Sequence, residues 1–142
     1  MAEWVSTPAG RHLRGRVTAN TAPEVALRKA LHALGARFRL HAKLGPGCTA
    51  DIVLPKRGIA VFVDGDFWHS CPVHGRQKPF AGPNAALWAA KIERTRERDR
   101  RSSQVAENGG WTVVRVWECV VTSDATAAAR AVLGGKSPPP VP

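Results

Sequence analysis

The chain has 142 residues, enough for one domain with a real hydrophobic core and too few for two comfortable ones. Because 21 Lys and Arg residues face 11 Asp and Glu residues, the net charge of +10 favours a polyanionic partner, nucleic acid before membrane, and no apolar stretch approaches the roughly 20 residues of a membrane-spanning helix. The alternative to such a partner is a basic surface that is simply solvated. The chain shows no secretory pattern and has three cysteines, which suits a reducing cytoplasm where the thiols stay free or bind metal.

Two contrasting segments open the chain. Residues 1–20 carry Arg14 and Arg16 among glycines and prolines without any apolar period, which is typical of a flexible basic arm that follows phosphates. From Thr21 the spacing Thr-x-x-Glu, completed by Glu24, matches a helix capping box, and leucines recur at helical intervals until Gly35. We therefore predict a helix between Thr21 and Gly35.

A short strand and a hairpin are predicted next. Phe38 and Leu40 alternate with polar residues like a half-buried strand, and a Gly-Pro-Gly loop follows. Two β-branched runs, residues 52–54 and 59–63, are then separated by a turn at residues 55–58. Antiparallel pairing brings the start of the first run beside the end of the second, so Asp51 and Asp64 should meet at one edge of the sheet.

The second half of the chain is predicted to form a helix, a strand and a helix. A charged helix begins at Asn84 and ends at the glycines after Asn108. Residues 111–117 suit a third core strand, which a helical crossover makes parallel to one hairpin strand, and residues 123–133 suit a short closing helix. The Pro-rich residues 135–142 are expected to be a disordered tail, which leaves a folded domain over residues 21–134.

Four side chains suggest metal-dependent hydrolysis at the predicted sheet edge. Carboxylates such as Asp51 and Asp64 are the hard ligands that Mg²⁺ prefers. His69 follows closely and could act as a general base near neutral pH, unless it is an ordinary surface residue. Asp99 on the long helix could orient that imidazole, or it could simply pair with a neighbouring arginine.

The loop after the hairpin also carries candidate zinc ligands. Cys71-x-x-His74 is half of a zinc knuckle, Cys119 follows the third predicted strand, and Asp66 could supply a fourth ligand. In the same loop Phe67 and Trp68 could stack on bases or separate them, although aromatic residues more often belong to a core.

Several motifs together resemble the very-short-patch-repair (Vsr) mismatch endonucleases. The similarity runs in order from about residue 10 to residue 120 and rests on residues 21–28, 50–53, 61–69, 71–75, 88–92, 97–101 and 110–119. It implies a restriction-endonuclease-like α/β/α fold with a central mixed sheet. It also implies a Mg²⁺-dependent enzyme that nicks one strand of double-stranded DNA on the 5′ side of the thymine in a T:G mismatch. We expect the protein to be a monomer, with mismatch-repair proteins as candidate partners.

The resemblance also implies roles for individual residues. Asp51 becomes the principal metal ligand together with the carbonyl of Val63, while Asp64 stands where some members have His. His69 becomes the general base oriented by Asp99, and Glu24 holds water bound to the metal ion. The wedges beside the mismatch are Phe67, Trp68 and Trp88, and the structural Zn²⁺ ligands are Cys71, His74 and Cys119. Asp66 occupies a position where the family often has Cys, so the zinc site either gains a carboxylate or lacks the metal.

Two alternatives stay open. The chain could be a related nickase with a different trigger, such as another mismatch, modified DNA or invading DNA. It could also be a module that recognises DNA distortion through its wedges without cutting.

Overall fold

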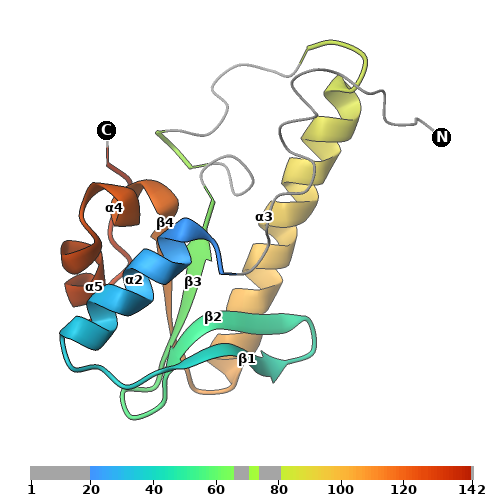
Figure 1. The fold of residues 1–142 in the computed structure, drawn as a ribbon. Coiled ribbons are helices and arrows are strands. Elements are labelled where there is room, and N and C mark those ends of the chain that lie inside the picture. The colour runs from blue at the N-terminus through green and yellow to red at the C-terminus, as the bar shows by residue number, and fades with distance from the viewer. Residues whose placement is uncertain (1–19, 66–70, 74–80, 142) are drawn as a thin grey trace.

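The computed structural model describes residues 20–65, 71–73 and 81–141 (Figure 1). Within these ranges the elements are, in chain order, α2 (Ala22–Ala33), β1 (Arg39–Gly45), β2 (Cys48–Leu54), β3 (Ile59–Asp64), α3 (Ala85–Asn108), β4 (Thr112–Trp117), α4 (Glu118–Ser123) and α5 (Ala125–Leu133).

The four strands form one mixed sheet in the order β1-β2-β3-β4. Strands β1 and β2 pair antiparallel, as do β2 and β3, whereas β4 runs parallel to β3 after the crossover through α3. The predicted hairpin is therefore confirmed, and the third predicted strand is parallel to its second arm. The register places Val61 of β3 beside Val114 of β4.

Helices cover both faces of this sheet. Side chains of β3 alternate, so that Val61 joins the core beneath α2, α4 and α5, while Phe62 joins the core beneath α3. The larger core contains Leu27 and Leu31 of α2, and the smaller one contains Ala106 of α3. The result is the three-layer α/β/α arrangement expected for the fold (Figure 1).

Helix α3 extends well beyond the sheet. Its 24 residues correspond to about 36 Å of helix, and its buried residues, Ser102 and Ala106, both lie in its C-terminal half. Figure 1 shows the N-terminal turns standing clear of the strands. No helix among the described residues combines the length and the apolar character needed to cross a membrane.

Two features of the C-terminal region differ from the expectation. A short helix, α4, follows β4 directly, with Val120 and Val121 buried in the larger core. The Pro-rich segment expected to be disordered contains no helix or strand over residues 136–141, yet the Ser137 hydroxyl accepts a hydrogen bond from the Arg115 amide at 3.0 Å, and Val141 packs against the larger core. This segment therefore lies along the outer edge of β4.

Candidate active site

Asp51 lies where the two hairpin strands stop pairing regularly. The β2–β3 ladder runs from Leu54 opposite Ile59 to Ile52 opposite Val61. At the next position the Asp51 Oδ2 atom accepts a hydrogen bond from the Val63 amide at 2.7 Å. A side chain thus takes the place of a backbone acceptor, and this bond fixes the carboxylate at the mouth of the hairpin.

Glu24 reaches this point from the first turn of α2. Thr21 caps the helix, its Oγ1 accepting from the Glu24 amide at 3.5 Å, and the Glu24 Oε2 atom accepts from the Asn20 amide at 2.7 Å. The predicted capping box is therefore present with one difference: the Glu24 side chain accepts from the amide of Asn20 and not from that of the N-cap residue Thr21. Glu24 is nevertheless only 5% exposed and faces the sheet, so its carboxylate serves both the helix start and the site.

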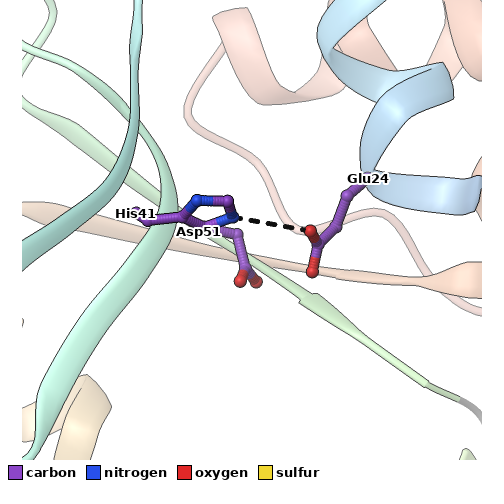
Figure 2. Close-up of side chains that lie close together, drawn as sticks. All are labelled: Glu24, His41 and Asp51. Carbon is purple, nitrogen blue, oxygen red and sulfur yellow. Dashed lines mark ion pairs between the residues drawn. The ribbon is translucent and has the colours of Figure 1, made fainter. Parts of the chain in front are cut away.

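His41 is the third member of the cluster. The β1–β2 register pairs Leu40 with Ile52 and Ala42 with Ala50, which places His41 across from Asp51. Its φ of 48° lies in the left-handed region and turns the backbone locally. The imidazole Nε2 lies 3.7 Å from Glu24 Oε2, and Figure 2 shows the His41 and Glu24 side chains pointing toward each other beside the Asp51 carboxylate.

The donor atoms of Glu24, His41 and Asp51 all lie within 4.8 Å of one another. Adjacent ligands of a six-coordinate ion with bonds of about 2.1 Å are about 3 Å apart, and opposite ligands are about 4.2 Å apart. Small side-chain movements are sufficient to bring the three donors into that range. The cluster therefore fits a divalent cation.

The electrostatics of the cluster centre on Asp51. Its pKa is raised to about 7, chiefly because burial desolvates the carboxylate; the hydrogen bond from the Val63 amide lowers the pKa, and the nearby Glu24 and Asp64 carboxylates raise it. Asp51 therefore holds a proton close to neutral pH when no cation is bound. A cation would replace that proton.

Asp64 has a different environment from the one predicted. It lies at the same edge of the sheet, but its oxygens accept hydrogen bonds from Arg115 Nη1 at 3.0 and 3.3 Å. The Asp64 side chain is 7% exposed, so this is a largely buried ion pair, and the Arg115 guanidinium also lies 4.4 Å from the centre of the Phe62 ring. A metal-binding role for Asp64 stays a prediction, since the carboxylate already has a cationic partner.

Arg115 also joins Asp64 to the long helix. Its Nη2 donates to the Asp99 carbonyl and to the Ser102 hydroxyl, both at 2.9 Å, and its Nε donates to the Ser103 hydroxyl at 2.8 Å. The Asp99 carboxylate lies 3.7 Å from Arg115 Nη1. Asp99 therefore contacts an arginine of β4 rather than being only an i,i+4 partner within its own helix.

The two described candidate zinc ligands lie close together. The Sγ atoms of Cys71 and Cys119 are 3.9 Å apart, although the residues are separated by 48 positions in the sequence. Two thiolates bound to a tetrahedral Zn²⁺ at about 2.3 Å are separated by about 3.8 Å. The third cysteine, Cys48, is buried on β2 and donates to the Ser102 carbonyl at 3.1 Å, and burial raises the pKa of its thiol.

The remaining candidates are placed only in part. Trp88 lies in the first turn of α3 and is half-buried. The structure does not cover the other predicted site residues, which lie outside the described ranges: Arg14, Arg16, Asp66, Phe67, Trp68, His69 and His74.

Sequence reasoning did not identify His41 or Arg115 as site residues. For His41 the sequence offered no firm signal, because the pairing that places it opposite Asp51 includes a register shift between Lys43 and Gly45. For Arg115 the signal was a single cation inside an apolar strand, which requires a buried anionic partner. Its partner could not be named before the β3–β4 register was known.

Comparisons with known proteins identify the family of the chain. A sequence model of the family DNA mismatch endonuclease Vsr matches residues 5–74. The Type II nicking enzyme V.NaeI of Lentzea aerocolonigenes is 45% identical over 122 residues, covering 83% of this chain and 72% of that protein. The Type II nicking enzyme V.XorIIP of Xanthomonas oryzae pv. oryzae is 40% identical over 131 residues, covering 92% of this chain and 94% of that protein. The DNA mismatch endonuclease Vsr of Escherichia coli K12 is 32% identical over 111 residues, covering 78% of this chain and 69% of that protein. The chain belongs to the Vsr family of DNA mismatch endonucleases.

Proposed function

We propose that this protein is a metal-dependent endonuclease that nicks one strand of duplex DNA on the 5′ side of the thymine in a T:G mismatch. The observation that carries the proposal is the convergence of Asp51 and Glu24 at the open end of the hairpin, in a chain of the Vsr family. Two carboxylates in a strongly basic protein would repel a DNA phosphate unless a cation lay between them.

The chemistry is hydrolysis of a phosphodiester by in-line attack of water. Asp51 and Glu24 would hold Mg²⁺, which neutralises phosphate charge and stabilises the charge that develops on the reacting oxygens. His69 would take the proton of the attacking water while the bond between phosphorus and the 3′ oxygen breaks, and the departing 3′ oxygen would take a proton from solvent water. Asp99 would orient His69. The contacts between Asp99 and Arg115 restrain helix α3, which carries Asp99.

A stripe of arginines on α3 supports DNA as the substrate. Arg94, Arg98 and Arg101 are exposed and spaced by four and three residues, so they share one face of the helix. Within the described part of the chain none of them pairs with an acid. In contrast, ion pairs with Glu93 and Glu97 occupy Arg96 and Arg100. The unpaired stripe can therefore bind phosphates without first losing an ion pair.

Zinc belongs to the proposal as a structural cofactor. The short distance between Cys71 and Cys119 supports it, because the two thiols need little movement to share one tetrahedral ion. We expect close to one equivalent of Zn by elemental analysis, lost in Cys119→Ser with a lower melting temperature. Less than about half an equivalent of Zn in the folded wild-type protein would show that the site does not hold zinc when Asp66 stands where the family often has Cys.

Cleavage mapping tests the proposed reaction directly. Purified protein is incubated with Mg²⁺ and a duplex that contains one T:G pair, with each strand labelled in turn. We expect a single nick 5′ of the mismatched thymine and its loss in Asp51→Ala. If no nick forms, or if Asp51→Ala cuts as well as wild type, the proposed function is wrong.

The relatives support a second candidate, a strand-specific nickase with another trigger. Two of them are described as Type II nicking enzymes, a name that does not mention a mismatch. Comparing T:G with fully paired, otherwise mismatched and modified duplexes separates the two candidates. Equal cleavage of paired and T:G duplexes would favour the second, whereas binding without any turnover would indicate a module that only recognises distortion.

A further inference from the structure

We propose that His41 is a nitrogen ligand of the cation held by Asp51 and Glu24, and that it gives the site a preference for first-row transition ions such as Mn²⁺ over Mg²⁺. The inference rests on the proposed metal-dependent function. It adds to that function a ligand and a class of cation that the carboxylates alone would not select.

The position of His41 is specific to the open end of the hairpin. It lies across from Asp51 on the neighbouring strand, and its Nε2 atom is 3.7 Å from Glu24 Oε2. Three donor atoms thus come from three separate elements, α2, β1 and β2, and all lie within 4.8 Å of one another (Figure 2). A single His on an exposed strand is common without any binding function, whereas three donor atoms that converge from separate elements indicate a binding site.

The surroundings leave the imidazole available to an ion. Its side chain is 34% exposed, whereas that of Glu24 is 6% exposed, so the open side of the cluster is the His41 side. Asp64 is nearby but pairs with Arg115, and therefore a neutral nitrogen is the better-placed third donor. One imidazole beside two carboxylates forms a mixed N/O ligand set.

A mixed ligand set changes which cation binds best. Mg²⁺ strongly prefers oxygen ligands and gains little from an imidazole. Transition ions accept imidazole readily, and their affinity rises from Mn²⁺ to Co²⁺ and Ni²⁺. A change in the ratio of Mn²⁺ to Mg²⁺ affinity is consequently the signature of nitrogen ligation, because general loosening of the site would weaken both ions alike.

The test compares four forms of the full chain: wild type, His41→Asn, His32→Asn and Asp51→Asn. Asn tolerates the positive φ of His41 and lacks the imidazole. His32 is an exposed histidine of α2 and serves as the matched control. Circular dichroism and thermal melts verify folding, and His41→Gln provides a second variant if His41→Asn is unstable.

Mn²⁺ binding is followed by electron paramagnetic resonance, with pulsed measurements to detect coupling to ¹⁴N, and Mg²⁺ is measured by competition. We expect ¹⁴N coupling in wild type and His32→Asn and none in His41→Asn. We also expect His41→Asn to bind Mn²⁺ about tenfold more weakly with less than about a threefold change for Mg²⁺.

The outcomes separate this inference from the proposed function. Absence of ¹⁴N coupling in wild type, its persistence in His41→Asn, or equal weakening of both ions would overturn the role of His41 while leaving the nuclease intact. If Asp51→Asn bound Mn²⁺ as tightly as wild type, the metal site of the proposed function would itself be misplaced.

Discussion

The raised pKa of Asp51 predicts an unusual dependence of stability on pH. In the folded protein Asp51 keeps its proton up to about pH 7, whereas an unfolded Asp releases it near its ordinary pKa of 3.8. Between these two values the folded state binds more protons than the unfolded state, so this residue makes the protein less stable as pH rises. Its favourable contribution is fully present below pH 3.8 and is lost as pH rises through about 7.

The magnitude follows from the same shift. Each pKa unit corresponds to about 1.4 kcal/mol, so a shift of about three units gives a total on the order of 4 kcal/mol. Asp51→Asn imitates the protonated carboxyl: its amide oxygen can still accept from the Val63 amide, and its NH₂ can donate to Glu24.

Urea unfolding of wild type and Asp51→Asn in the absence of divalent ions, between pH 4.5 and 8, measures the effect. We expect the stability of wild type relative to the variant to fall by up to about 1.4 kcal/mol per pH unit and to level off above pH 7, where the variant is the more stable protein. Mn²⁺ at pH 8 should restore stability to wild type only. Glu107→Gln, which removes an exposed carboxylate on α3, should show no such slope. A difference between wild type and Asp51→Asn that is independent of pH would refute the assignment of a raised pKa to this residue.

Three further predictions concern the surrounding structure and DNA binding. Arg115→Met should cost about 3–5 kcal/mol in unfolding free energy because it removes the cationic partner of the buried Asp64 carboxylate, and adding Asp64→Asn should recover part of the loss. Gly45→Ala should cost about 1–3 kcal/mol, since the new Cβ would lie 2.5 Å from Val105 Cγ1, and adding Val105→Ala should restore most of it. For DNA binding, we compare a double Arg→Gln variant at Arg94 and Arg98 with one at Arg96 and Arg100, which removes the same charge. We expect the slope of log affinity against log salt to fall by about two only when the unpaired Arg94 and Arg98 are replaced.

The sequence was sufficient for the framework and for part of the site. Apolar runs and turn residues predicted the hairpin, and the crossover rule predicted that β4 would run parallel to one of its strands. These features are local or follow from chain direction, so one sequence carries them. Asp51 was identified from its chemistry and Glu24 from the family resemblance, and the fold places them together.

The contacts of Asp64 and His41 could not be predicted in the same way, because both depend on register and on helix placement. Antiparallel pairing correctly places Asp64 at the edge that holds Asp51, but it says nothing about which cation lies beneath it. That cation is Arg115, fixed by the parallel register of β3 and β4 and by hydrogen bonds to α3. His41 depends on a local backbone irregularity at φ 48°, for which no residue type in the sequence is a reliable sign.

The pairing of Asp64 with Arg115 has a consequence for the charge of the site. With Asp64 neutralised, the carboxylates of the described residues that face the opening are Asp51 and Glu24, whose combined charge when both are ionised is −2. One divalent cation balances that charge, and the neutral His41 imidazole can contribute a ligand without adding another negative charge. A third free carboxylate would leave the occupied site negative and would repel the phosphate that must approach it. Arg115, which need not contact DNA or metal, thus determines whether the cation site is neutral or anionic when the substrate arrives.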